Sequence, residues 1–169
     1  MTVPQGSVGS VLDLPGPRRN VAPMTLHLIK LCVGIERVED LRERQQARLD
    51  DKKANGEPPE LLHITRMTPR RQDELLDGGS LYWVIKLSTR VRQRIIGLRP
   101  YSDRRGVKRC AIVLDPKLVL TVPKRRRPFQ GWRYLKPQDA PDDLPNSRTK
   151  AGAHIPPELR AELMELGLL

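Results

Sequence analysis

Apolar and polar positions follow different periods along the chain, and they divide residues 24–137 into strands and helices. Residues 25–34 form a mostly apolar run that ends at a glycine, which is typical of a buried strand. Residues 35–56 place apolar side chains near helical spacing with Gln45 in the gap, acids in the first turn and lysines in the last. We therefore predict a strand followed by a helix that buries one narrow face.

The middle of the chain contains short runs of apolar and branched residues. Residues 61–67 read as a second strand, and residues 68–79 as a short helix that begins after Thr68 and ends at two glycines. Further strands are predicted at residues 80–88, 89–96, 107–115 and 117–122. Residues 124–137 carry two prolines and a glycine, which favours a loop, or a loop with a short edge strand.

The order of these elements predicts an α+β fold, because helices come early and antiparallel strands dominate later. We expect a small mixed, largely antiparallel sheet or a barrel, with two early helices and a short C-terminal helix. Residues 24–137 would form a single domain. Residues 1–23, rich in Pro, Gly and Ser, would be a disordered leader with Met24 as the native start, and residues 138–169 a flexible tail that ends in the short helix.

Composition narrows the cellular setting. The chain has no run of eighteen apolar residues, and residues 1–23 lack the apolar centre of a secretory signal, so we expect no membrane partner. Cys32 and Cys110 each lie in an apolar run, where a free thiol behaves as a small hydrophobe. These observations predict a protein of a reducing compartment, the cytoplasm.

Positive charge is concentrated in one block of the sequence. The net charge is +11, and residues 86–136 hold sixteen Lys or Arg and two acids, so this block carries +14 and the rest of the chain −3. An evenly solvated surface does not explain such a concentration. The block predicts contact with a polyanion.

Two patterns within the block indicate where that contact would be made. On a strand, three alternate arginines of residues 89–96 point to one face, and three of the six aromatic residues follow four consecutive cations in residues 124–137. Cations suit phosphates and rings suit unpaired bases. The alternative is that the rings anchor a loop to the core and the cations are a solvated flank. The candidate nucleic-acid-binding residues are Arg90, Arg92, Arg94, Lys124, Arg125, Arg126, Arg127, Trp132, Arg133 and Tyr134.

Other chemistry has weak support in the sequence. His27 and His63 lie on early apolar strands, which is typical of structural histidines, and a thiol–imidazole pair with Cys32 is not required by any spacing. The chain has no paired-cysteine motif and no HExxH, so we expect no metal, no cofactor and no catalytic residue.

Four segments together resemble a known bacterial family. MTLHLIKLCVG, LLDGGSLYWVIK, VRQRI and RRPFQGWRYLKP are similar to domain of unknown function 1489, found mainly in alphaproteobacteria, over residues 24–145. That family implies no activity and no catalytic residues. Where its members continue after WVIK with a glycine, this chain has Leu87, which weakens the case for a close backbone approach there. A looser similarity is to PUA-like barrels, small folds that bind RNA or modified bases.

Three functions are compatible with these patterns. The leading hypothesis is a module that binds RNA or other single-stranded nucleic acid through the basic block and its rings. The second is a protein-interaction or assembly factor whose arginines meet an acidic partner. The third is an enzyme on an anionic phosphorylated substrate with His63 as general base, which requires His63, an arginine and a carboxylate in one pocket.

Overall fold

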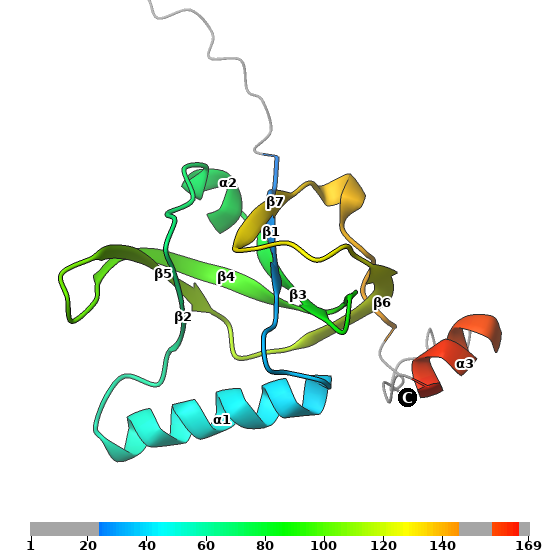
Figure 1. Ribbon diagram of the computed structural model, residues 1–169, viewed down its shortest axis with the longest axis horizontal. Helices are drawn as coiled ribbons and strands as arrows, with labels where there is room; N and C mark the ends of the chain where they lie inside the picture. The colour runs from blue at the N-terminus through cyan, green and yellow to red at the C-terminus, as the bar shows by residue number, and fades with distance from the viewer. Residues whose placement is uncertain (1–23, 146–156, 166–169) are drawn as a thin grey trace, which may run out of the picture.

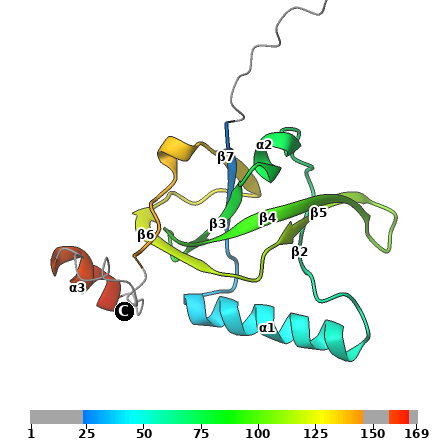
Figure 2. The ribbon, with the colours of Figure 1, turned by 180° about the vertical axis from the view of Figure 1, so that it is seen from behind.

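A strongly bent mixed sheet forms the body of the protein, as Figures 1 and 2 show from opposite sides. The computed structural model describes residues 24–145 and 157–165. Within those residues the sheet has seven strands in the order β2-β5-β4-β3-β1-β7, with β6 paired to β4. The elements are β1 (His27–Leu31), α1 (Val38–Ala54), β2 (Leu61–Thr65), α2 (Gln72–Leu76), β3 (Ser80–Ile85), β4 (Ser88–Ser102), β5 (Lys108–Leu114), β6 (Val119–Arg125), β7 (Trp132–Leu135), the 3₁₀ turn η1 (Pro137–Asp139) and α3 (Pro157–Glu165).

The predicted α+β class is confirmed. Every strand pair is antiparallel except β1 with β3, which are parallel because α1, β2 and α2 intervene between them in the chain. Of the two predicted forms, sheet or barrel, the sheet is correct: β2 and β7 are edges that share no backbone ladder. Nothing confirms the PUA-like similarity.

The helix predicted for residues 35–56 is α1, and it buries the narrow face that its spacing indicates. Val38, Leu41, Gln45 and Leu49 are its buried residues. α1 lies along one end of the bent sheet (Figure 1), where its apolar side chains join the larger core cluster. Leu163 of α3 is buried in the same cluster, so a C-terminal helix is present as predicted.

A buried amide network ties α1 to the sheet. Gln45 of α1 and Gln93 of β4 exchange two hydrogen bonds of 2.8 and 2.9 Å. The Gln93 side chain also accepts from Trp83 Nε1 at 2.8 Å and donates to the Asp115 carbonyl at 3.0 Å. Since a buried amide is costly unless its partners are present, this network fixes where α1 sits on the sheet.

The segment after β7 is packed along the sheet. Residues 138–145, which the sequence places in the tail, follow β6 through backbone bonds from Val122 N to the Asp142 carbonyl and from Leu144 N to the Leu120 carbonyl, both 2.8 Å. Thr121 and Asp143 form an isolated bridge. The predicted leader, residues 1–23, lies outside the described residues.

The β3–β4 hairpin turns on two residues with positive φ. Lys86 has φ 47° and Leu87 φ 62°, the left-handed conformation that a two-residue hairpin turn demands and that glycine adopts most easily. The chain therefore accepts a strained turn where a glycine would relieve it.

Candidate functional site

Register places two rows of residues side by side on opposite faces of the sheet. One row runs Val91, Trp83, Lys30, Trp132 across β4, β3, β1 and β7. The neighbouring row runs Arg92, Tyr82, Ile29, Arg133 across the same four strands. Adjacent residues of a strand point to opposite faces. Trp132 therefore lies on the face opposite to Arg92 and Arg133, and the sequence-predicted candidates are split between two surfaces.

Arg90 does not continue the predicted arginine stripe. Register shifts against both β3 and β6 place a β-bulge at this residue, and a bulge breaks the alternation on which the stripe depends. Arg90 is 5% exposed, and its Nε has no hydrogen-bond partner among the described residues. Burial lowers the pKa of this guanidinium. In this position Arg90 does not present its charge to solvent.

Arg92 and Arg94 lie on the face away from α1, and a carboxylate already pairs with the first. Arg92 makes a two-pronged ion pair with Asp143, 2.6 Å at each nitrogen, and its Nη1 lies 3.1 Å from Ser80 Oγ. Arg94 is exposed and lines a hollow of about 470 Å³ together with Arg92, Asp115 and Lys117. The positive charge of this hollow is thus partly neutralised.

The four consecutive cations at the end of β6, residues 124–127, divide into two side chains with hydrogen-bond partners and two exposed side chains without an ion pair. Lys124 Nζ and Arg126 Nη2 both donate to the Asp139 carbonyl at 2.9 Å. Arg125 and Arg127 are exposed and form no ion pair with a described carboxylate. Arg125 and Arg127 can therefore contact a ligand without breaking a hydrogen bond, whereas Lys124 and Arg126 cannot.

The two rings of β7 join the edges of the sheet. Trp132 Nε1 donates to the Met67 carbonyl at 3.0 Å, and the Tyr134 hydroxyl accepts from the backbone N–H groups of Arg70 and Arg71 at 2.9 and 3.3 Å. These contacts connect β7 to the segment after β2, which no backbone ladder joins to it. The predicted alternative, rings that anchor a loop, thus describes part of their role, while both rings stay partly exposed.

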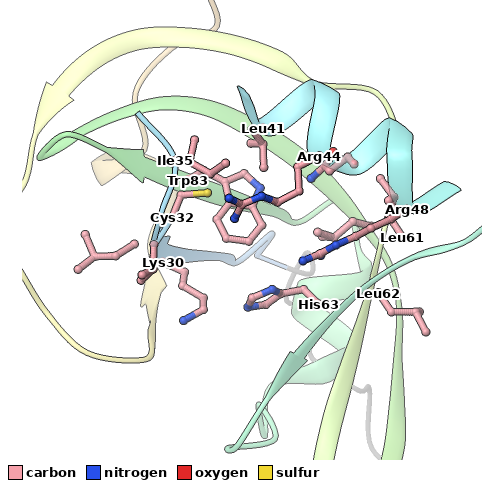
Figure 3. A pocket seen from close by; sticks show the side chains of 14 residues that line it. Lys30, Cys32, Ile35, Leu41, Arg44, Arg48, Leu61, Leu62, His63 and Trp83 are labelled. Atoms are coloured by element: carbon pink, nitrogen blue, oxygen red, sulfur yellow. The ribbon is translucent and has the colours of Figure 1, made fainter. Parts of the chain in front are cut away.

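A cationic pocket opens on the same face as Trp132, between β1, β2 and α1. Its volume is about 220 Å³, and its floor consists of core residues that include Leu61, Trp83 and Leu114. The polar ends of Lys30, Arg44, Arg48 and His63 lie around its opening (Figure 3). We call these four residues with the floor the cationic pocket.

The charges of the cationic pocket have no carboxylate beside them. None of its fourteen lining residues is Asp or Glu. Arg44 Nη2 donates to the Gly34 carbonyl at 3.0 Å, while Lys30 and Arg48 form no ion pair with any carboxylate in residues 24–145 or 157–165. Arg44 and Arg48 lie one helical turn apart, where like charges repel. An anion between them would relieve that repulsion.

His63 adds an unsatisfied polar atom to this pocket. Its ring packs edge-on against Trp83 with centroids 5.1 Å apart, and its buried Nε2 has no hydrogen-bond partner among the described residues. Burial, followed by Lys30 and Arg48, lowers the pKa of His63 to about 4. His27 differs, since its Nδ1 accepts from Ser80 N at 3.1 Å. The structural role expected of both histidines fits His27 better than His63.

Cys32 lines the same pocket but does not form an activated thiol. Burial raises the pKa of Cys32 to about 11 despite the nearby Arg44, Lys30 and Arg48, so the thiol stays protonated at neutral pH. In the described part of the chain, no three His, Cys, Asp or Glu residues group in a way that could hold a metal ion. No helix there is long and apolar enough to cross a bilayer.

Sequence reasoning missed Lys30, Arg44 and Arg48 because they lie outside the basic block. One signal was present: Arg44 and Arg48 are spaced i, i+4 beside Gln45, the polar residue on the buried stripe of the helix. The pairing of that helix with β1 and β2 around one opening has no local signature.

Fold and site together define an α+β protein with an open, bent sheet and a cationic pocket at its edge. Over residues 28–169 the chain matches the family described as "Protein of unknown function (DUF1489)", and it therefore belongs to that family, as the sequence resemblance predicts. No curated protein and no solved structure matches the chain.

Proposed function

We propose that this protein binds single-stranded nucleic acid, RNA in the first instance, with phosphate held in the cationic pocket. The observation that carries the proposal is the group Lys30, Arg44 and Arg48 around one opening whose lining contains no carboxylate. Guanidinium forks match phosphate oxygens, and a lysine supplies a compact charge beside them.

The tryptophans on either side of Lys30 support a nucleic-acid ligand over a simple anion. Lys30 is paired with Trp83 on β3 and with Trp132 on β7. Trp83 is buried, whereas Trp132 is partly exposed beside the pocket. A base stacked on an exposed ring contributes about 1–3 kcal/mol. Trp132 is thus positioned to receive a base next to a bound phosphate.

The exposed cations Arg125 and Arg127, at the end of β6, extend this surface. Arg126 N donates to the Leu87 carbonyl at 2.7 Å, and Lys86 pairs with Glu36 at 3.4 Å. These contacts connect the segment to the β3–β4 turn and to the loop after β1, which lines the pocket. Arg125 and Arg127 are therefore proposed as additional phosphate contacts. Contact of Arg92, Arg94 and Arg133 with nucleic acid stays a prediction for the opposite face.

The enzymatic alternative has two of its three required groups. His63 and Arg48 share the cationic pocket, but no carboxylate lines it to orient the imidazole. A general base works best with a pKa near the operating pH, and the pKa of His63 is about 4. Binding is therefore the better supported function.

A salt titration tests the proposal. One phosphate in the cationic pocket and one each at Arg125 and Arg127 make about three phosphates, so log K for single-stranded RNA should fall with log salt at a slope of about −2. A flat titration, or no binding at low salt, contradicts the proposal. Retention of one protein partner from nuclease-treated lysate, with no RNA affinity, would favour the acidic-partner alternative instead.

A further inference from the structure

We infer that the cationic pocket takes the terminal phosphate of a nucleic-acid strand, a phosphate monoester, in preference to an internal phosphodiester. The inference rests on the proposed function and specifies its ligand. Three observations carry it: the charge that lines the pocket, the size and closed floor of the pocket, and the unsatisfied Nε2 of His63.

The charge of the pocket matches a monoester better than a diester. Three cations line it with no acid. A phosphate monoester carries about −1.5 to −2 at neutral pH, whereas each internal phosphate carries a single negative charge. A doubly charged group between Lys30, Arg44 and Arg48 offsets more of their mutual repulsion than a singly charged group does.

The dimensions of the pocket favour the end of a strand. Pockets that enclose a whole drug-sized molecule occupy about 300–1,000 Å³. The cationic pocket, at about 220 Å³, is smaller, and buried side chains such as Leu41, Leu61 and Leu114 close its floor. A strand that runs through needs room for nucleotides on both sides of the bound phosphate. A strand that ends there needs room only for the phosphate and part of one sugar.

His63 provides the third argument. Its Nε2 is buried in the pocket wall without a described partner, and a buried polar atom of this kind is expected to find one. A neutral imidazole can donate from a protonated Nε2, and a phosphate monoester has three terminal oxygens, so one can accept from His63 while the others face the cations. An internal phosphodiester has only two such oxygens to share among the three cations and the imidazole.

The position of Trp132 agrees with such a ligand. This ring lies across from Lys30 in the β1–β7 ladder, and its bond to the Met67 carbonyl fixes its orientation. The first nucleotide after the terminal phosphate would reach this ring as it leaves the pocket. Binding would then depend chiefly on a phosphate and a base at one end of the strand, while Arg125 and Arg127 add contacts to internal phosphates.

The test compares RNA strands that differ only at their ends. Fluorescence anisotropy with the full chain would use a twelve-nucleotide RNA that has a 5′-phosphate, a 3′-phosphate, or hydroxyls at both ends, with the dye on the same internal base in every strand. One of the two phosphorylated strands should bind between about 10- and 100-fold more tightly than the hydroxyl-ended strand, the range that a charge-assisted hydrogen bond supplies.

Two matched variants locate the effect. Arg48→Gln should abolish the preference for the phosphorylated end while its unfolding midpoint stays unchanged, because Arg48 is exposed. Arg42→Gln removes the same charge from an exposed position of α1 that does not line the pocket, and it should keep the preference. Equal affinity for all three strands would overturn the inference and leave RNA binding standing, whereas absence of binding to every strand would overturn the proposed function as well. A preference that survives in Arg48→Gln would also overturn the inference.

Discussion

The cationic pocket and the arginines of β4 both concentrate positive charge, but they differ in what lies beside each charge. Arg92 is held by both oxygens of Asp143, and Arg90 is buried at a bulge. Lys30 and Arg48 come from separate elements and meet no carboxylate in the part of the chain that the structure describes. Dense positive charge in sequence therefore does not by itself make an available cationic surface. A cation is available to a ligand only where no other segment of the chain places a carboxylate beside it.

The largest effect is expected at Gln93, which alternates with the arginines of β4 but points to the core. Gln93→Leu should lower the free energy of unfolding by about 4 kcal/mol. It leaves the buried Trp83 Nε1 and the Gln45 amide without hydrogen-bond partners, and each such group costs about 1–3 kcal/mol. Urea denaturation measures this. Arg94 is the next residue along and is exposed, so Arg94→Gln should leave the urea midpoint unchanged. Similar losses in both variants would contradict the conclusion that Gln93 and Arg94 point to opposite faces of β4.

The pH dependence of stability distinguishes His63, in the cationic pocket, from His27, on the opposite face of the sheet. The folded-state pKa of His63 is about 4 and its unfolded value about 6.5, so only the unfolded state takes up this proton between those values. Stability contributed by neutral His63 is complete above pH 6.5 and is lost as pH falls towards 4, by up to about 3 kcal/mol. His63→Gln should remove this slope in urea midpoints measured from pH 4.5 to 7.5.

His27 is the matched control on the opposite face. Burial and then Arg92 lower its pKa as well, but by less than the pKa of His63. His27→Gln should therefore keep most of the pH dependence between pH 4.5 and 6.5. If His27→Gln removes the slope and His63→Gln keeps it, the assignment of the buried neutral imidazole to the pocket is wrong.

Paired substitutions compare the two cationic regions in binding. Lys30→Gln with Arg48→Gln should weaken binding of single-stranded RNA about 100-fold at low salt, because two phosphate contacts are lost. Arg92→Gln with Arg94→Gln makes the same change in charge on the other face and should alter affinity by less than about threefold, since Asp143 already neutralises Arg92. Anisotropy titrations give both values. Reversed ranking would place the interface on β4.

The smallest effect is expected at Tyr134. Tyr134→Phe removes the hydroxyl that accepts from Arg70 N and Arg71 N, and should cost about 1 kcal/mol of stability with no change in RNA affinity. Chemical denaturation and the same anisotropy assay test this. A loss of affinity at unchanged stability would mean that Tyr134 contacts the ligand directly.

Local patterns were sufficient to predict much of the fold. The spacing of Val38, Leu41, Gln45 and Leu49 predicts the buried face of α1, and alternation predicts the outward placement of Arg92 and Arg94. These signals are local because helix and strand periods act over a few residues.

The candidate site was harder to predict from the sequence, because it depends on strand register and on contacts between distant segments. The bulge at Arg90 has no sequence marker, and Asp143 lies 51 residues from the arginine that it pairs with. The pocket joins β1, α1 and β2 around one opening, and each contributes cations or an imidazole that looks unremarkable in its own segment. Only three-dimensional proximity reveals them as a group.

Photo-crosslinking tests most directly which face binds nucleic acid. The full chain would be irradiated with 4-thiouridine-containing single-stranded RNA, digested, and analysed by mass spectrometry to locate RNA-linked peptides. We predict crosslinks around the cationic pocket, in residues 30–35, 44–48 and 61–63 and at Trp132. Crosslinks confined to the opposite face, at Arg92, Arg94, Lys117, Arg133 and residues 141–143, would contradict the account.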